Sequence, residues 1–504
     1  MKNLFKITAL VSFVFLYTCD DFVDVEPVGP DADNYFNDEQ EYEKALIGAY
    51  DLLQSSFWNV LTGVIASDDY AAGGDSFNFD QPTLQNVNQM IHTPSDNNQL
   101  RDIWNLMYAG LNRANYLLEF KDKTEFSGKE QIIAQAYFLR AYYTFELVKF
   151  FGNVPLKVEE RGGVNRIVDQ RTIIGEQYDL NRTASISAAY SLIEEDLKEA
   201  IVNLPVVQED IYKVTKGSAQ ALLGKVYLYH GTFDATKFAD ASEVLGAVIG
   251  SGQYTLVTGT DHQELFESSA ENGTETVFEI QYTGVEPAGW NCIICSEGSY
   301  FPKFCGPRSP YDNQEFDTGW GFCLPSQELY DLFDANDPRI GISFYDLRDQ
   351  QDSYSLSRDD TGLFNKKYLP RKADERAGSD PLNFANNYRA IRYADVLLMA
   401  AEADAQSGGA NSETYLNDVR ARAFGDNSHD YTSAEGVSVL EAIYLERRKE
   451  LAGEGHRFFD LVRTNKAAAA IPGFTANKNE VFPIPLIELE LANAVERWGQ
   501  NQGY

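Results

Sequence analysis

The strongest constraint on the fold is a series of long segments in which apolar residues recur every three or four positions. The clearest segment starts at Lys129, and its apolar positions are Ile132, Ala136, Leu139, Tyr143, Leu147 and Phe150. This spacing places apolar side chains along one face of an α-helix. Gly152 and Pro155 follow, in the order usual at the C-terminal end of a helix. The segment therefore predicts an amphipathic helix that buries one face against a neighbour.

The same periodicity returns through much of the chain and predicts paired helices. The further helical segments are residues 38–53, 98–119, 187–204, 215–230, 238–249, 388–406, 413–424 and 437–451. Short breaks that contain Gly or Pro separate many of them, which favours helical hairpins stacked on one another in the manner of tetratricopeptide repeats. No strict repeat period accompanies the pattern.

Two segments interrupt the helices. Residues 57–92 are rich in Asp, Asn and Gly, and the region that begins at residue 254 mixes short strand-like runs with Gly, Pro, Asn and aromatic residues. Loops of this length in a compact chain are usually functional or form a subdomain. The predicted organisation is a helical scaffold over residues 19–253 with a loop insertion at 57–92, a loop-rich ligand-binding subdomain over 254–386 and a C-terminal helical scaffold over 387–504.

The charge balance argues against polyanionic partners. Lys and Arg together number 42 against 76 Asp and Glu, which gives a formal net charge of −34. Nucleic acid and anionic lipid surfaces repel such a chain. We therefore expect no nucleic-acid partner.

The first residues have the form of an export signal. Lys2 and Lys6 precede an apolar run that is too short to span a bilayer. The run ends at Leu16-Tyr17-Thr18-Cys19, which resembles the site where a signal peptidase cuts before an acylated cysteine. We therefore expect residues 1–18 to be a lipoprotein signal peptide and Cys19 to carry the lipid anchor. The alternative is a plain secretory signal followed by an incidental cysteine.

Motifs spread over nearly the whole chain resemble one family. They are residues 19–27, 104–108 with Asn112 and Asn115, 138–143, 151–155, 215–216, 228–229, 392–398, 401–403, 446–451, 454–461, 482–485 and the C-terminal 500–504. In this order they resemble the SusD/RagB family, the glycan-binding outer-membrane lipoproteins of Bacteroidetes-type bacteria. Gln502 departs from the proline of the family's terminal Q-N-P-G-Y. Residues 254–384 carry no such match.

The resemblance implies a fold, a partner and a location. The implied fold is mainly α, with four tetratricopeptide-like helix pairs as a superhelical platform and a loop-rich subdomain with short strands. The implied partner is a SusC-like TonB-dependent transporter that the lipoprotein covers as a lid, with an oligosaccharide as ligand. The acidic Asp20-Asp21 after Cys19 is similar to the surface-export signals of such lipoproteins. We therefore expect the protein on the outer membrane, lipid-anchored and facing the cell exterior.

The sequence contains little that indicates catalysis. Glu446, Glu450 and Glu454 recur every four residues beside several arginines, and their spacing places them along one helical face. Ion-paired helix packing is favoured over acid/base catalysis for this cluster, and the same interpretation applies to Arg140 and Arg392. None of the common nucleophile, zinc-protease or nucleotide-binding motifs occurs in the sequence. We therefore expect no enzyme activity, no catalytic residue, no cofactor and no bound metal.

Four cysteines form a cluster within the loop-rich region. They are Cys292, Cys295, Cys305 and Cys323. Outside the cytoplasm, oxidised pairs are the commoner fate of such a cluster, so disulfides are favoured. Free thiols and a zinc site with four thiolate ligands are the alternatives. Three pairings are possible, and the sequence does not choose among them.

Aromatic rings in the long loops are the candidate ligand contacts. Sugar rings have flat C–H faces that lie against aromatic rings, and their hydroxyls bond to amide, carboxylate or guanidinium groups. The candidates are Tyr70, Asp75, Phe77, Asn78 and Phe79 in one loop and Trp290, Asn291, Tyr300, Arg308 and Trp320 in another. The resemblance implies that loops of these two regions contact the ligand, but it assigns no single residue. The alternative for each ring is packing in the core of the subdomain.

Three functions remain open from the sequence. The favoured one is a non-catalytic surface receptor that captures oligosaccharides and delivers them to the transporter. A peptide-binding receptor on the same scaffold is the second, as the RagB side of the family suggests. A glycoside hydrolase, which needs two suitably spaced carboxylates, is the third and least favoured.

Overall fold

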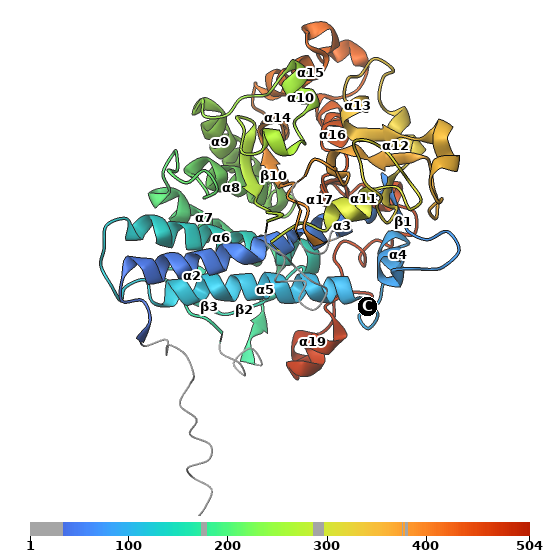
Figure 1. Ribbon diagram of the computed structural model, residues 1–504. Coiled ribbons are helices and arrows are strands. Elements are labelled where there is room, and N and C mark those ends of the chain that lie inside the picture. Colours follow the sequence, from blue (N-terminus) through green and yellow to red (C-terminus); the bar gives the residue numbers. More distant parts are fainter. Residues whose placement is uncertain (1–33, 173–178, 286–296, 375, 378–381) are drawn as a thin grey trace, which may run out of the picture.

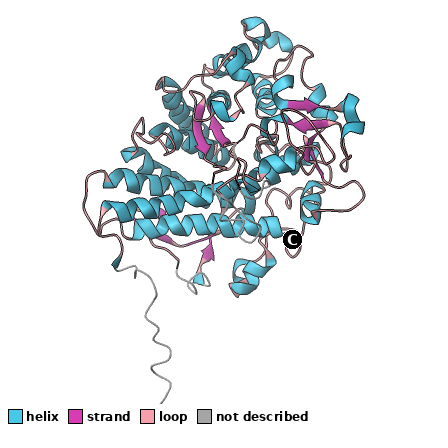
Figure 2. Cartoon of the chain, viewed as in Figure 1, coloured by secondary structure: helices cyan, strands magenta, loops and turns pink. Residues whose placement is uncertain are grey.

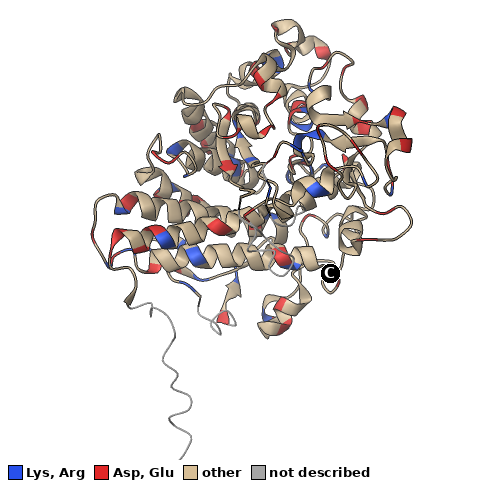
Figure 3. Cartoon of the chain, in the orientation of Figure 1, with Lys and Arg blue, Asp and Glu red and all other residues tan. Residues whose placement is uncertain are grey.

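The computed structural model describes residues 34–172, 179–285, 297–374, 376–377 and 382–504. Helices make up most of the regular structure in these residues, and the strands between them are short (Figures 1 and 2). Acidic positions are spread over every part of the described chain (Figure 3). No helix within the described residues is both long and apolar enough to cross a membrane. The predominance of helices confirms the mainly helical architecture expected from the periodicity.

A stack of nine helices forms the platform of the molecule. Each helix packs against the next one along the stack, and α15 and α16 both pack on α14. The helices are α2 (Glu39–Asp51), α5 (Asn98–Glu119), α6 (Lys129–Phe151), α7 (Ile186–Asn203), α8 (Lys216–His230), α9 (Lys237–Gly250), α14 (Tyr393–Ser407), α15 (Ser412–Phe424) and α16 (Val439–Glu450). Figure 1 shows α2, α5, α6 and α7 side by side at the lower left. The chain leaves the stack after α9 and returns to it at α14, so the loop-rich part is inserted between two helical blocks.

Local sequence signals set the ends of several helices. The Asp38 carboxylate accepts a hydrogen bond from the backbone N–H of Glu41 at the start of α2, and Ser185 caps α7 in the same way. Thr215 and Ser218 form a reciprocal capping box at the start of α8. Gly408 ends α14 with a φ of 80°, a left-handed conformation that favours glycine.

Close helix packing in the platform depends on Gly110. A Cβ atom at this position of α5 would lie 2.4 Å from the Tyr143 ring of α6. The Tyr143 hydroxyl in turn donates a hydrogen bond to the backbone carbonyl of Ala49 in α2, at 2.6 Å. One buried tyrosine therefore ties three helices together, and the missing side chain of Gly110 makes room for it.

The two interrupting segments pair with each other. Strand β1 (Tyr70–Gly73) runs antiparallel to β7 (Phe322–Pro325), with Tyr70 opposite Pro325 and Gly73 opposite Phe322. A second small core under this pair gathers Phe316, Leu324, Leu347, Tyr354, Phe364 and Leu369. The other elements of this region are α11 (Phe301–Cys305), α12 (Gln327–Asp331), α13 (Ile340–Ser343), β8 (Phe344–Asp346) and β9 (Leu363–Asn365). Loops that are about 250 residues apart in the sequence thus build one surface.

The segment 57–92 contains more regular structure than the loop insertion expected there. It holds α3 (Phe57–Ile65) and α4 (Pro82–Asn88) on either side of β1. Nearly every side chain of α3 is buried, including Asn59 and Thr62. A helix that is buried all round has no polar face, so the periodicity that identifies surface helices is absent from its sequence.

The predicted helix 388–406 is wrong at its start. Residues Tyr388–Arg392 form β10, which pairs antiparallel with β6 (Thr276–Ile280), and α14 begins only at Tyr393. Pairing with a distant strand overrides the local helical pattern here. The strand-like run near residue 276, by contrast, is confirmed as β6.

Candidate functional site

The segment 74–81 forms a turn that is ordered by its own carboxylates. Asp75 Oδ1 accepts hydrogen bonds from the backbone N–H groups of Phe77 (2.8 Å) and Asn78 (2.9 Å). The backbone N–H of Asp75 donates to Asp80 Oδ1 at 2.7 Å. This turn holds the Phe77 side chain 94% exposed and that of Phe79 43% exposed. Two aromatic rings are therefore presented to solvent from a fixed backbone.

Arg308 connects this turn to the second loop. Its Nη2 lies 2.9 Å from Asp75 Oδ2, and its Nη1 donates to the backbone carbonyl of Trp320 at 3.1 Å. The backbone N–H groups of Asn78 and Phe77, together with the Arg308 guanidinium, lower the pKa of the Asp75 carboxyl. Asp75 is therefore an anion at neutral pH, and its ion pair with Arg308 holds the two loops together.

A third segment, residues 355–358, flanks the turn. The backbone of Ser357 pairs with Asp75, and the N–H of Arg358 donates to the carbonyl of Gly74 at 3.0 Å. The Arg358 guanidinium lies over the Phe79 ring, 5.2 Å from its centre, so it supports this ring from one side. We call the surface formed by residues 74–81, 355–358 and Arg308 the loop face.

The segments of the loop face meet at Gly321. A Cβ atom there would lie 2.0 Å from Ser357 Oγ and 2.7 Å from the Arg308 side chain. Its φ of 68° is also in the left-handed region. Only glycine allows so close an approach of three chain segments.

The structure separates the predicted ligand residues into two groups. Asp75, Phe77, Asn78 and Phe79 lie together on the loop face, with Arg308 between the loops. Tyr70 and Tyr300 are instead only 4% and 2% exposed, so their predicted ligand contact is corrected here to core packing.

Tyr70 and Tyr300 are buried because their rings pack against the hydrophobic core. Tyr70 belongs to β1, and its ring is part of the core on which that strand packs. The Tyr300 ring packs 4.8 Å from Phe57 of the buried α3. Burial removes a ring from reach of a surface ligand, as the core-packing alternative expects.

Trp320 is partly buried at the border of the loop face. Its ring meets Phe304 edge to face, with centres 5.0 Å apart. Cys305 and Cys323 are buried and carry free thiols, so the predicted disulfides are wrong for these two residues. Burial, and the neighbouring Cys323 thiol, raise the pKa of Cys305. The other members of the predicted sets, Trp290, Asn291, Cys292, Cys295 and Cys19, lie outside the described residues.

Sequence reasoning missed Arg358 and its neighbour Leu356, which is exposed. Both lie in a turn that Asp360 organises, because its carboxylate accepts hydrogen bonds from the backbone N–H groups of Ser357 and Gly362. The Asp360-Thr361-Gly362 run could have indicated this turn. No local signal places it beside residues 74–81.

The carboxylates that could have suggested catalysis are ion-paired in the interior. Arg392 contacts Glu275 (2.8 Å), Glu450 (3.1 Å) and Glu454 (2.8 Å). Burial alone would raise the pKa of Glu450, but the guanidiniums of Arg422 and Arg392 bring it well below its usual range. These carboxylates are buried and already paired with Arg392, which confirms the ion-pair interpretation of this cluster.

Glu446 and Arg140 also form ion pairs in the interior. Glu446 pairs with Arg339 and Arg420, and Arg140 pairs with Asp169 and Asp196. All of these side chains are largely buried. The predicted structural role of Arg140 is therefore confirmed as well.

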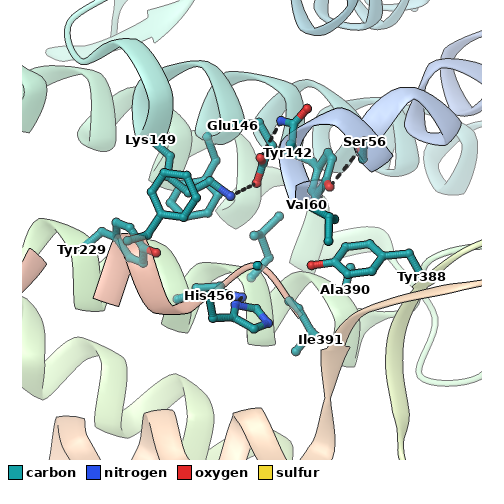
Figure 4. Close-up of a pocket in the computed structure, with 16 residues that line it drawn as sticks. Ser56, Val60, Tyr142, Glu146, Lys149, Tyr229, Tyr388, Ala390, Ile391 and His456 are labelled. Carbon is teal, nitrogen blue, oxygen red and sulfur yellow. Dashed lines mark hydrogen bonds and ion pairs between the residues drawn. The ribbon is translucent and has the colours of Figure 1, made fainter. Parts of the chain in front are cut away.

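A cavity at the centre of the molecule is polar but small (Figure 4). Its volume is about 30 Å³, and Glu146 accepts hydrogen bonds there from Asn59 Nδ2 (2.7 Å) and Lys149 Nζ (2.6 Å). Burial and the nearby Lys225 lower the pKa of His456 to about 3, so this ring is neutral. The space suits about two water molecules and is too small for a sugar ring.

Profiles of two families match the chain. The first, described as "SusD family", matches residues 341–481, and the second, described as "Starch-binding associating with outer membrane", matches residues 21–228. SusD-like protein P2 of Formosa agariphila is 27% identical over 96% of this chain and 97% of its own length.

Several solved structures share the fold. A laminarin-binding SusD-like protein is 35% identical, with a TM-score of 0.80 over 93% of this chain and 100% of that one. Surface glycan-binding protein A from Bacteroides fluxus is 28% identical, with a TM-score of 0.81 over the same shares of the two chains. Its counterpart from Bacteroides thetaiotaomicron, solved in complex with laminarihexaose, is 25% identical, with a TM-score of 0.79 over 92% of this chain and 99% of that one.

Proposed function

The chain belongs to the SusD family, and on that premise we propose that it is a non-catalytic receptor on the cell surface that captures oligosaccharides. In this proposal Cys19 anchors the protein to the outer membrane, and the captured sugar passes to a SusC-like TonB-dependent transporter. Laminarin-type β-glucans are the first ligands to consider, because the 35%-identical relative is named as laminarin-binding.

The observation that carries the proposal is the construction of the loop face. Phe77 and Phe79 offer apolar ring faces, and Asp75, Asn78 and Arg358 offer polar groups around them. Sugar rings combine C–H faces with hydroxyls, so they need both kinds of group. Hydrogen bonds and the Asp75–Arg308 ion pair fix this arrangement before a ligand binds, which lowers the ordering cost of binding.

Replacement of both rings tests this site. The Phe77→Ala/Phe79→Ala variant should bind laminarihexaose at least about tenfold more weakly, because stacking anchors typically contribute on the order of 2 kcal/mol. Phe233→Ala is the matched control, since this ring is 57% exposed on the distant α8–α9 connection. Calorimetric titration measures both variants, and unaltered affinity in the double variant would remove the loop face as the site.

The competing functions have distinct readouts. Retention of glycans without turnover of labelled substrates supports a receptor, whereas release of shorter sugars would favour a glycoside hydrolase. A combined glycan and peptide array separates the saccharide receptor from the peptide-binding alternative. Binding to peptides alone would contradict the proposal.

The anchor is tested at Cys19. Cys19→Ala should release the protein from the outer-membrane fraction, because acylation at this residue is the proposed attachment. Failure of labelled palmitate to enter the wild-type chain would contradict the anchor. Proteinase K on intact cells tests the outward orientation, and complete protection would place the protein on the periplasmic side.

The transporter is tested by co-purification. Extraction of native membranes in mild detergent should recover the protein together with an abundant β-barrel transporter. Recovery of the protein alone in several detergents would contradict the delivery step. Glycan binding by the purified protein is a separate result and does not depend on this outcome.

A further inference from the structure

A large cavity lies beneath α5, away from the loop face. Its volume is about 370 Å³, and its walls include α5, β2 (Pro155–Leu156), α19 (Leu486–Leu491) and α20 (Val495–Trp498). In Figure 1, α19 lies below α5, whereas β1 and α12 lie at the right of the molecule. Clefts that bind small molecules usually have volumes of a few hundred Å³ or more, so this cavity has the size of a ligand site.

Three aromatic rings form apolar walls of the cavity. Trp104 and Tyr108 lie one turn apart on α5, with ring centres 4.8 Å apart, and Trp498 comes from α20. The Tyr108 hydroxyl donates to the carbonyl of Pro155 at 2.9 Å, and Trp498 Nε1 donates to the carbonyl of Leu180 at 2.7 Å. These bonds satisfy the polar atoms of Tyr108 and Trp498 and fix both rings, so their ring carbon remains as wall surface.

Three asparagines of the same helix add polar groups. Asn105, Asn112 and Asn115 recur at spacings of two turns and one turn, so α5 presents them along one face. Asn112 Oδ1 accepts from the N–H of Thr172 at 2.6 Å, and Asn115 Oδ1 accepts from Arg140 Nη1 at 2.8 Å.

The hydrogen bonds to the Oδ1 atoms fix the orientation of the Asn112 and Asn115 carboxamides. Within the described residues, neither Nδ2 atom has a hydrogen-bond partner, and the Asn105 side chain has none either. The cavity thus combines fixed aromatic surface with amide groups that have bonding capacity to spare.

We infer that this cavity is a second binding site for a short neutral saccharide. Ring carbon and amide donors in one enclosure match the C–H faces and hydroxyl oxygens of a sugar. The charged side chains of the lining, Lys157 and Glu488, have opposite signs, so the cavity does not select a charged ligand. The choice of a saccharide among neutral ligands rests on the proposed function, whereas the site itself is separate from the loop face.

Ala109 provides a way to block the cavity without the loss of any contact. It lines the cavity, is exposed, and lies on α5 one turn from both Asn105 and Asn112. Ala109→Trp should fill the space with a bulky side chain. Ala239→Trp is the matched control, because Ala239 is an exposed residue of α9 outside the cavity. Asn105→Ala is a milder second variant that removes one carboxamide.

The experiment is a calorimetric titration of the full mature chain in a detergent without a sugar headgroup. The probe is a β-glucan disaccharide, which is too short to bridge the two sites. The wild type and Ala239→Trp should bind two disaccharides per chain, and Ala109→Trp should bind one. Asn105→Ala should weaken the second site at least about fivefold, since one hydrogen bond to a ligand contributes about 1 kcal/mol.

The outcomes separate this inference from the proposed function. Identical binding by the wild type, Ala109→Trp and Asn105→Ala would overturn the inference and leave the loop face intact. Loss of all binding in Ala109→Trp, with no effect of the Phe77→Ala/Phe79→Ala variant, would support the cavity and contradict the loop face. No heat with any saccharide would overturn both.

Discussion

Arg392 and Arg308 are both arginines held by carboxylates, but their surroundings differ. Arg392 lies in the interior of the C-terminal scaffold, 1% exposed, among Glu275, Glu450 and Glu454. Arg308 lies at the surface, where Asp75 faces it across two loops. The interior uses charge to lock distant segments together, whereas the loop face uses it to hold exposed rings in place. The role of each arginine therefore depends on its burial and not on its residue type.

The largest expected effect comes from removal of the interior arginine. Arg392→Ala leaves three carboxylates buried without their partner, so the free energy of unfolding should fall by about 3–5 kcal/mol. Arg308→Ala is the matched change at the surface and should cost no more than about 1 kcal/mol. Urea denaturation of both variants measures the difference. If Arg392→Ala does not fold, Arg392→Lys, which keeps the charge, takes its place. An equal loss of unfolding free energy at Arg392 and Arg308 would contradict the proposed difference between the interior and the loop face.

The interior should also be the acid-sensitive region. Burial lowers the pKa of His92 and His262 to about 4 and about 3, respectively. Below pH 6.5 the unfolded chain binds protons that these folded rings do not, so stability should fall as the pH drops towards 4. At pH 4.5 the cost is about 2.5 kcal/mol for one such histidine, because that pH lies two units below 6.5 and each pKa unit corresponds to about 1.4 kcal/mol.

His92→Gln isolates one of these contributions. The His92 ring contacts the Tyr504 hydroxyl at 2.7 Å, and glutamine can keep a hydrogen bond there without titrating. Its stability should fall less steeply than that of the wild type between pH 6.5 and 4.5 in urea denaturation. Parallel curves would exclude His92 as a source of the acid sensitivity. Glycan affinity should stay constant over the range from pH 6.5 to 5, since the pKa of Asp75 is lowered.

A change at Gly321 should affect the loop face in both stability and binding. Gly321→Ala introduces a Cβ atom 2.0 Å from Ser357 Oγ at a φ of 68°. We expect a loss of about 1–2 kcal/mol from the left-handed backbone and a weaker affinity for laminarihexaose, because Arg308 must move. Denaturation and calorimetry measure the two effects. Unaltered affinity would show that the tight contact between the loops does not position the rings.

The smallest expected effect comes from Gly246, which is partly exposed in the middle of α9. A Cβ atom there meets nothing within 4 Å, and its backbone is helical. Gly246→Ala should therefore stabilise the protein by about 0.5–1 kcal/mol and leave glycan affinity unchanged. Thermal denaturation measures the gain. Destabilisation by Gly246→Ala would contradict the expectation that glycine is needed only where the backbone is left-handed or another chain segment approaches closely.

The helical platform could be predicted from the sequence to a large degree. The periodic segments from residue 98 to 250 appear as α5 to α9, and Thr215 and Gly152 mark the start of α8 and the end of α6 as predicted. The predicted start at Ser187 is wrong by two residues, because Ser185 caps α7. The ordered motifs over the chain identified the family, and the ion-pair role of Glu446, Glu450 and Glu454 was predicted correctly. These features depend on neighbours within one or two helical turns, so the local sequence contains them.

The candidate site was predictable only in part. The sequence marked the loop that contains Asp75, Phe77, Asn78 and Phe79, but it could not tell these exposed residues from the buried Tyr70. It gave no sign of Arg358, since the segment that contains it becomes a neighbour only through pairing with residues 74 and 75. In the same way, pairing with β6 turned the predicted helical start at Tyr388 into a strand.

The sequence by itself therefore determined the helices, their order, the family and the presence of charged and aromatic residues. Only the tertiary structure decided which of those residues face solvent and which are locked inside. The physical reason is that burial and ion pairing depend on groups far apart in the chain, such as Arg392 and Glu275 or Asp75 and Arg308. Helix formation depends on hydrogen bonds between residues four positions apart, which a local pattern predicts.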